Sequence, residues 1–106
     1  MSANIFHGPS GTVEAWQYDG TAARAQEIAD AAGLEIVQQA PRAVALRVPE
    51  TLSFSPGDYY EADTREIAIL TGGWFWVDRA AKIIGCEWDQ YFREHFAHAA
   101  QPASAR

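Results

Sequence analysis

The sequence predicts one small α+β domain over residues 1–100, built from a mostly antiparallel sheet of about five or six strands and two helices. Three observations support this class. Short apolar segments with alternating side chains are separated by turns that contain Gly or Pro, which is typical of antiparallel strands. Two other segments, 21–32 and about 87–98, repeat their apolar residues at helical spacing. The length of 106 residues fits a single domain.

The charge of the chain limits the kinds of partner that we expect. The net charge is −6 and the isoelectric point is about 4.8. Arginines are scattered beside a single lysine, Lys82. Direct binding to nucleic-acid phosphates requires clustered Lys and Arg side chains, so we expect no direct nucleic-acid partner. The oligomeric state is left open, and a homodimer is compatible with the sequence.

The cellular location is inferred from three further features. The chain has one cysteine, its first residues lack the pattern of a signal peptide, and no apolar run approaches the roughly 18 residues of a membrane span. These features favour a cytoplasmic protein without a membrane partner. The last six residues, 101–106, are expected to be a disordered tail.

The first third of the chain combines a strand, 12–18, with a helix, 21–32. Asp19 or Thr21 can cap the first turn of this helix, and Gly33 suits the position after its last turn, where φ is positive. The strand alternates between Val13, Ala15 and Gln17 on one face and Thr12, Trp16 and Tyr18 on the other. The apolar stripe of the helix consists of small residues, namely Ala22, Ala25, Ile28, Ala29 and Ala32.

The middle of the chain is typical of short strands separated by turns. The expected strands are 34–38, 43–48, 52–54, 66–70 and 74–77. Gly72-Gly73 joins the last two, and a Gly-Gly pair between two apolar runs is a strong signal for a two-residue β-hairpin. This loop sets a register in which Ile69 lies opposite Trp76.

The last third of the chain contains one ambiguous segment and one clear helix. Residues 79–86 fit either a short helical turn that Asp78 caps or a strand. The helix that follows, about 87–98, carries a broad apolar face that we expect to be buried. Its members are Trp88, Tyr91, Phe92, His95, Phe96 and Ala99.

Three short patches of the chain carry a family resemblance. They are Val13-Glu14-Ala15-Trp16-Gln17 followed by Gly20 and a helix, Ser55-Pro56-Gly57-Asp58-Tyr59, and Cys86 and Asp89 ahead of Phe92 and Phe96. These patches resemble a family of small phage and prophage proteins with a "VEA-x-Q" strand, a "PGD-aromatic" turn and a "C-x-x-D-x-F" step into a closing helix. Here the segment between Gly57 and Cys86 is longer and carries a Trp-Phe-Trp run. The resemblance implies a phage origin and a compact α+β fold, and it implies no catalytic residue.

Candidate catalytic and metal-binding residues are few. His95 and His98 share one turn of the last helix, and with His7 they are the histidines of the chain, but a metal site requires a further clear ligand. Cys86 has apolar neighbours and lacks the local signature of a nucleophile, so we interpret it as a buried thiol. We therefore predict no catalytic, cofactor-binding or metal-binding residue and a protein that is not an enzyme.

Acidic side chains cluster around the central turns, at Asp58, Glu61, Asp63 and Glu66. Such a cluster is usually a solvated surface, and a denser one can imitate the phosphates of a nucleic acid. Paired carboxylates can also perform acid–base chemistry. An acidic nucleic-acid-mimic inhibitor and a small enzyme of unknown reaction are therefore the alternative functions.

The run Trp74, Phe75 and Trp76 carries the leading hypothesis for function. Strand alternation sends Trp74 and Trp76 to one face and Phe75 to the other. Either other elements cover both faces, or part of the run is exposed and marks a partner site. We expect a non-catalytic, phage-encoded interaction protein that binds a host or phage protein in host takeover or counter-defence. Its predicted partner-binding residues are Trp74, Phe75, Trp76, Glu61, Asp63 and Glu66.

Overall fold

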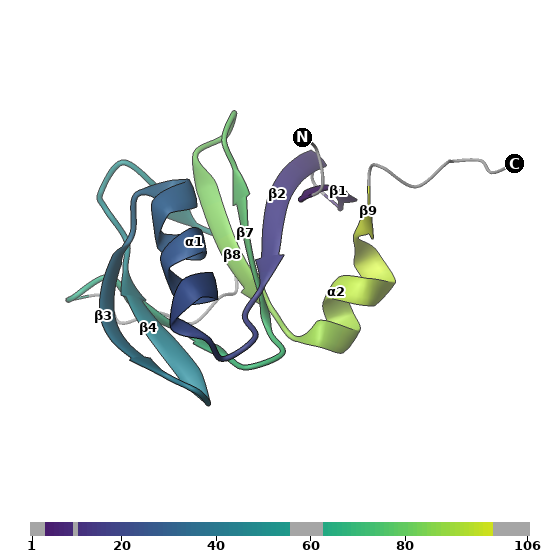
Figure 1. The fold of residues 1–106 in the computed structure, drawn as a ribbon. Helices are drawn as coiled ribbons and strands as arrows, with labels where there is room; N and C mark the ends of the chain where they lie inside the picture. The colour runs from purple at the N-terminus through teal and green to yellow at the C-terminus, as the bar shows by residue number, and fades with distance from the viewer. Residues whose placement is uncertain (1–3, 10, 56–62, 99–106) are drawn as a thin grey trace, which may run out of the picture.

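A computed structural model of the chain describes residues 4–9, 11–55 and 63–98 (Figure 1). It confirms the α+β class with two helices and mostly antiparallel strands, although the strands form two sheets instead of one. The elements in chain order are β1 Ile5–Gly8, β2 Gly11–Gln17, α1 Ala22–Ala32, β3 Glu35–Ala40, β4 Ala43–Arg47, β5 Ser53–Phe54, β6 Glu66–Leu70, β7 Trp74–Asp78, β8 Ile83–Glu87, α2 Asp89–His95 and β9 Ala97–His98. The predicted tail, the predicted Pro56-Gly57 turn, Asp58, Glu61 and Ala99 lie outside the described residues.

The two sheets face each other across the main core. The larger sheet has the strand order β5-β8-β7-β2-β1-β9, and the smaller has the order β3-β4-β6. Among the strand pairs that the structure describes, β5 and β8 are parallel and the others are antiparallel. Figure 1 shows α1 between the two sheets and α2 beside β2 and β1, at the other side of the larger sheet. Each face of the larger sheet therefore has its own cover.

Helix α1 forms where the sequence predicts it. The Thr21 side chain accepts a hydrogen bond from the Arg24 backbone N–H at 3.1 Å, and Asp19 in turn accepts from Thr21. Gly33 ends the helix with φ of 70°, a conformation that glycine adopts without steric cost. Its buried residues, Ala25, Ile28 and Ala29, belong to the main core, and the two alanines occupy little volume there.

The main core joins residues from both sheets and α1. Its apolar side chains include Trp16, Phe75, Val77 and Ile84 from the larger sheet, Val44, Leu46, Ile67 and Ile69 from the smaller sheet, and Ala25, Ile28 and Ala29 from α1. A second core lies on the other face of the larger sheet and is formed by Phe6, Val13, Ala15, Trp76, Phe92 and Phe96. The alternation predicted for β2 is confirmed, because Val13 and Ala15 enter the second core while Trp16 enters the main one.

The predicted Gly72-Gly73 hairpin is wrong. Strand β6 pairs with β4 in the smaller sheet, and β7 pairs with β2 and β8 in the larger sheet, so Ile69 lies opposite Val44 and Trp76 opposite Ala15 and Gly85. The glycine pair is instead the corner at which the chain changes sheets. Gly72 has φ of 94°, and a Cβ on Gly73 would lie 3.0 Å from the Leu70 carbonyl oxygen. Glycine is therefore required for a turn other than the predicted one.

Tyr18 holds this corner to the end of β2. Its backbone N–H donates to Gly73 O at 2.9 Å, and its carbonyl accepts from the Gly72 N–H at 2.8 Å. The buried phenol then reaches across to the smaller sheet, where its hydroxyl donates to Ala40 O and accepts from Gln39 Nε2. One residue thus connects both sheets and the turn between them, which fixes where β7 begins.

The ambiguous segment 79–86 is a turn followed by a strand. Asp78 Oδ1 accepts a hydrogen bond from the Ala81 N–H at 3.1 Å, Lys82 closes the turn with φ of 59°, and β8 follows from Ile83. The final helix is shorter than predicted, since α2 ends at His95 and β9 pairs with β1. The prediction that the apolar face of this helix is buried is only partly correct. Phe92 and Phe96 are buried, whereas Trp88, Tyr91 and His95 are exposed.

Replacement of Gly85 by alanine tests the second core. Trp76 lies over Gly85, and an added Cβ would lie 2.3 Å from Trp76 Cζ2. Overpacking of this kind costs about 1–3 kcal/mol, so Gly85→Ala should lower the thermal midpoint by several degrees. In a Trp76→Leu background the same substitution should cost much less. Equal costs in the two backgrounds, measured by circular dichroism melts, would contradict the packing of Trp76 on Gly85.

Candidate functional site

The three aromatic residues of β7 divide between the two cores. Phe75 has an exposed fraction of 0% and lies 6.3 Å from Trp16, between ring centroids, in the main core. Trp76 has an exposed fraction of 7% and donates from Nε1 to Glu87 at 3.2 Å. Trp74 is half-buried, and its ring stacks on Phe92 with the centroids 4.0 Å apart. The rings of Phe75 and Trp76 are thus part of the protein interior.

The acidic residues predicted to flank these rings lie elsewhere. Glu66 begins β6 in the smaller sheet, at the end of that strand away from the Gly72-Gly73 corner, whereas Trp74 follows that corner and begins β7 in the larger sheet. Arg47 donates to Glu35 at 2.8 Å and to Glu66 at 3.0 Å. These two hydrogen bonds raise the pKa of Arg47, and the bond to Glu35 has the larger effect. Asp63 is exposed beside this pair, and Glu61 lies outside the described residues. Among the described site residues, Glu66 and the Trp74–Trp76 run therefore lie in different sheets.

A different aromatic residue, Trp88, is the most exposed large apolar side chain in the described part of the chain, with an exposed fraction of 70%. It lies between the end of β8 and the start of α2. Leu70 and Tyr91 are also exposed, at 49% and 42%. A Cβ built on Gly73 would lie 3.0 Å from Leu70 O and 3.5 Å from Glu87 O, so the ends of β6 and β8 converge there. We call Trp88 and Tyr91, which are three residues apart at the start of α2, the Trp88 surface.

The backbone next to Trp88 is fixed by the carboxylate of Asp89. Asp89 Oδ1 accepts hydrogen bonds from Trp74 Nε1 at 2.9 Å and from Gln17 Nε2 at 3.2 Å. Arg93 Nε adds an ion pair at 2.9 Å, and Gln17 Nε2 also donates to Gly72 O at 2.9 Å. The first turn of α2 is thus joined to β2, β7 and the sheet-changing corner. The hydrogen bond from Trp74 has the largest effect on the pKa of Asp89 and lowers it from its ordinary value, and the hydrogen bond from Arg93 lowers it further.

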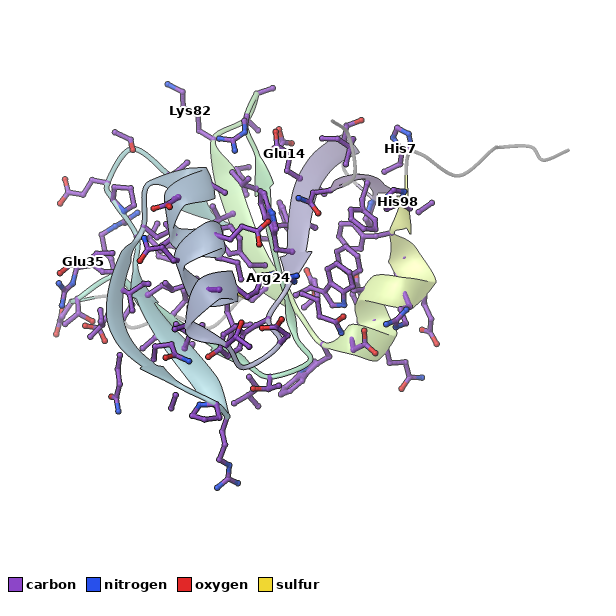
Figure 2. The ribbon with its side chains drawn as sticks, viewed as in Figure 1. His7, Glu14, Arg24, Glu35, Lys82 and His98 are labelled. Atoms are coloured by element: carbon purple, nitrogen blue, oxygen red, sulfur yellow. The ribbon has the colours of Figure 1, made fainter. Side chains whose placement is uncertain are left out.

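The histidines and the cysteine lie in separate places in the part of the chain that the structure describes. No three His, Cys, Asp or Glu side chains gather there in a way that could hold a metal ion. His95 stacks on Tyr91 with the centroids 4.0 Å apart, while His7 and His98 project from neighbouring strands β1 and β9 (Figure 2). Cys86 packs against the main core, on the opposite face of the larger sheet from α2.

Comparison of the chain with protein-family models, with curated protein sequences and with solved structures found no match. Over the described residues, neither helix has the length and the apolar composition that crossing a membrane would require.

Sequence reasoning missed the exposure of Trp88. The spacing of the aromatic residues places Trp88, Tyr91 and Phe92 on one broad helical face, and the prediction buried all three. One signal could have separated them. Trp88 directly precedes Asp89, whose charge favours the first turn of a helix, so Trp88 occupies the position before the helix and need not share its buried face.

Acid titration of an Asp89→Asn variant tests the carboxylate that fixes this surface. Because folding lowers the pKa of Asp89, its charged form contributes stability above the unfolded-state pKa of about 3.9 and loses it as the pH falls through the folded-state value. The thermal midpoint of Asp89→Asn should therefore lie below that of the wild type at neutral pH. The difference should shrink as the pH falls below about 3.9.

The matched control is Asp30→Asn, which changes an exposed carboxylate on α1 that accepts from Gln26. Its midpoint should stay close to that of the wild type across the same pH range. A difference between Asp89→Asn and the wild type that does not change with pH would contradict a structural role for the Asp89 charge.

Proposed function

We propose that the protein is a non-catalytic interaction protein that binds another protein through the Trp88 surface. The observation that carries this proposal is the 70% exposure of Trp88 on a backbone that hydrogen bonds hold in place. The other three tryptophans are buried or half-buried. Trp and Tyr are enriched among the residues that dominate protein–protein affinity, and the surface contains one of each.

The fixed backbone is an advantage for binding. Affinity is reduced when loops or side chains must become ordered on association. Trp88 lies between β8, which pairs with β7, and Asp89, whose carboxylate is held by Trp74, Gln17 and Arg93. The backbone at Trp88 is therefore ordered before a partner arrives, which supports a role in recognition.

The setting of this function is proposed from the sequence resemblance. The family that the chain resembles is phage-encoded, so the partner is a host or phage protein, and host takeover or counter-defence is the process. The single cysteine suits the reducing cytoplasm of a host cell. A nucleic-acid mimic is supported less well, because Arg47 pairs with both Glu35 and Glu66.

A capture experiment with a Trp88→Ala variant tests the proposed function. Tagged wild-type protein and the variant are incubated with lysate of the bacterial host, and captured proteins are identified by mass spectrometry. Loss of a Trp hot spot costs at least about 2 kcal/mol, or about 30-fold in affinity, so the variant should lose the partner while its circular dichroism spectrum is unchanged.

The matched control is Val37→Ala, which truncates an exposed apolar residue of β3 in the smaller sheet. It should capture the same partner as the wild type. Equal capture of every partner by the folded Trp88→Ala variant would remove the Trp88 surface from the interface.

A further inference from the structure

We infer that the Trp88 surface binds a basic segment of its partner, with an arginine or lysine side chain over the Trp88 indole. This inference rests on the proposed function and adds the chemistry of the partner to it. Two properties carry it: the face of an exposed indole, and an excess of carboxylates in the chain segment that contains this indole.

The carboxylates are close to Trp88 along the chain. Glu87 and Asp89 are its two neighbours, and Glu94 lies further along α2. Arg93 is the one cationic side chain, apart from histidine, between residues 87 and 98. Three carboxylates against one guanidinium leave this segment with a net charge of −2 when histidine is neutral, within a chain of net charge −6. A partner of complementary charge is basic.

Both neighbouring carboxylates are anchored. Glu87 accepts from Trp76 Nε1 at 3.2 Å, and Asp89 accepts from Trp74 Nε1 at 2.9 Å. A cation over the Trp88 ring would therefore meet two carboxylates whose positions are already fixed, of which Asp89 already pairs with Arg93 at 2.9 Å. Tryptophan is the strongest of the aromatic cation–π acceptors, and arginine is the more frequent cation. The guanidinium plane can stack on the indole while its N–H groups donate to a carboxylate.

A second copy of the chain fits this surface less well. Two copies would bring together net charges of −6 each. A stable protein interface removes about 800 Å² from water on each partner, whereas aromatic side chains bury roughly 150–250 Å² each when they are buried completely. With two partly exposed aromatic residues, the Trp88 surface provides less than that area and suits a peptide-sized segment.

Calorimetric titration with a defined basic peptide tests the inference. The wild type is titrated with octa-arginine at about 150 mM salt, where interactions between exposed charges are screened beyond about 8 Å. The same titration is repeated with Trp88→Leu, which keeps an apolar side chain and removes the aromatic face, and with the control Val37→Ala. Cation–π contacts predict a roughly 2- to 30-fold weaker affinity for Trp88→Leu and no change for Val37→Ala.

The outcomes separate this inference from the proposed function. Equal affinity of Trp88→Leu and wild type for octa-arginine would show charge attraction alone and overturn the inference. Absence of octa-arginine binding, together with Trp88-dependent capture of a protein partner, would also overturn it and leave the proposed function standing. A dimer of the wild type that Trp88→Leu makes monomeric in analytical ultracentrifugation would overturn it in favour of a second copy.

Discussion

The fold depends on one constraint, which is that strand β7 carries large rings on both faces. Phe75 points into one core, and Trp74 and Trp76 point into the other. A chain of 106 residues has little apolar area to spare, so both faces must be covered. Helix α1 and the smaller sheet cover Phe75, and α2 covers Trp74 and Trp76. The central position of β7, between β2 and β8, follows from this need for cover on both sides.

The second cover explains why an aromatic side chain remains outside. Helix α2 has seven residues and ends at His95. Phe92 within the helix stacks on Trp74, and Phe96, the first residue after the helix, packs near Trp76. The hydrogen bond from Trp74 Nε1 to Asp89 holds the start of the helix at one place on the sheet. With the helix in that position, Trp88 precedes its first turn and projects into solvent. The same contacts that complete the interior thus leave an ordered, exposed indole beside two carboxylates.

The local features of this fold were predictable from the sequence, and the long-range ones were not. The cap of α1 at Thr21, its end at Gly33 and the alternation of β2 depend on neighbouring residues, and these predictions are confirmed. The Gly72-Gly73 turn depends on hydrogen bonds to Tyr18, which lies more than 50 residues earlier in the chain. The glycine pair alone therefore indicated a hairpin, although the chain changes sheets at this point. Helix α2 ends at His95 because β9 pairs with β1 at the other end of the chain. Because this pairing involves residues far apart in the sequence, the predicted helix was too long and Trp88 was wrongly placed on its buried face.

Hydrogen exchange of the tryptophan indole N–H groups tests the central claim most directly. The chain has four tryptophans, and a Trp88→Phe variant assigns one of the four indole signals in an NMR spectrum. The N–H groups of Trp74 and Trp76 donate to Asp89 and Glu87 and should exchange slowly, whereas that of Trp88 should exchange rapidly with solvent. Slow exchange at Trp88, or exchange at Trp76 as fast as at Trp88, would contradict the division between interior rings and a single exposed indole.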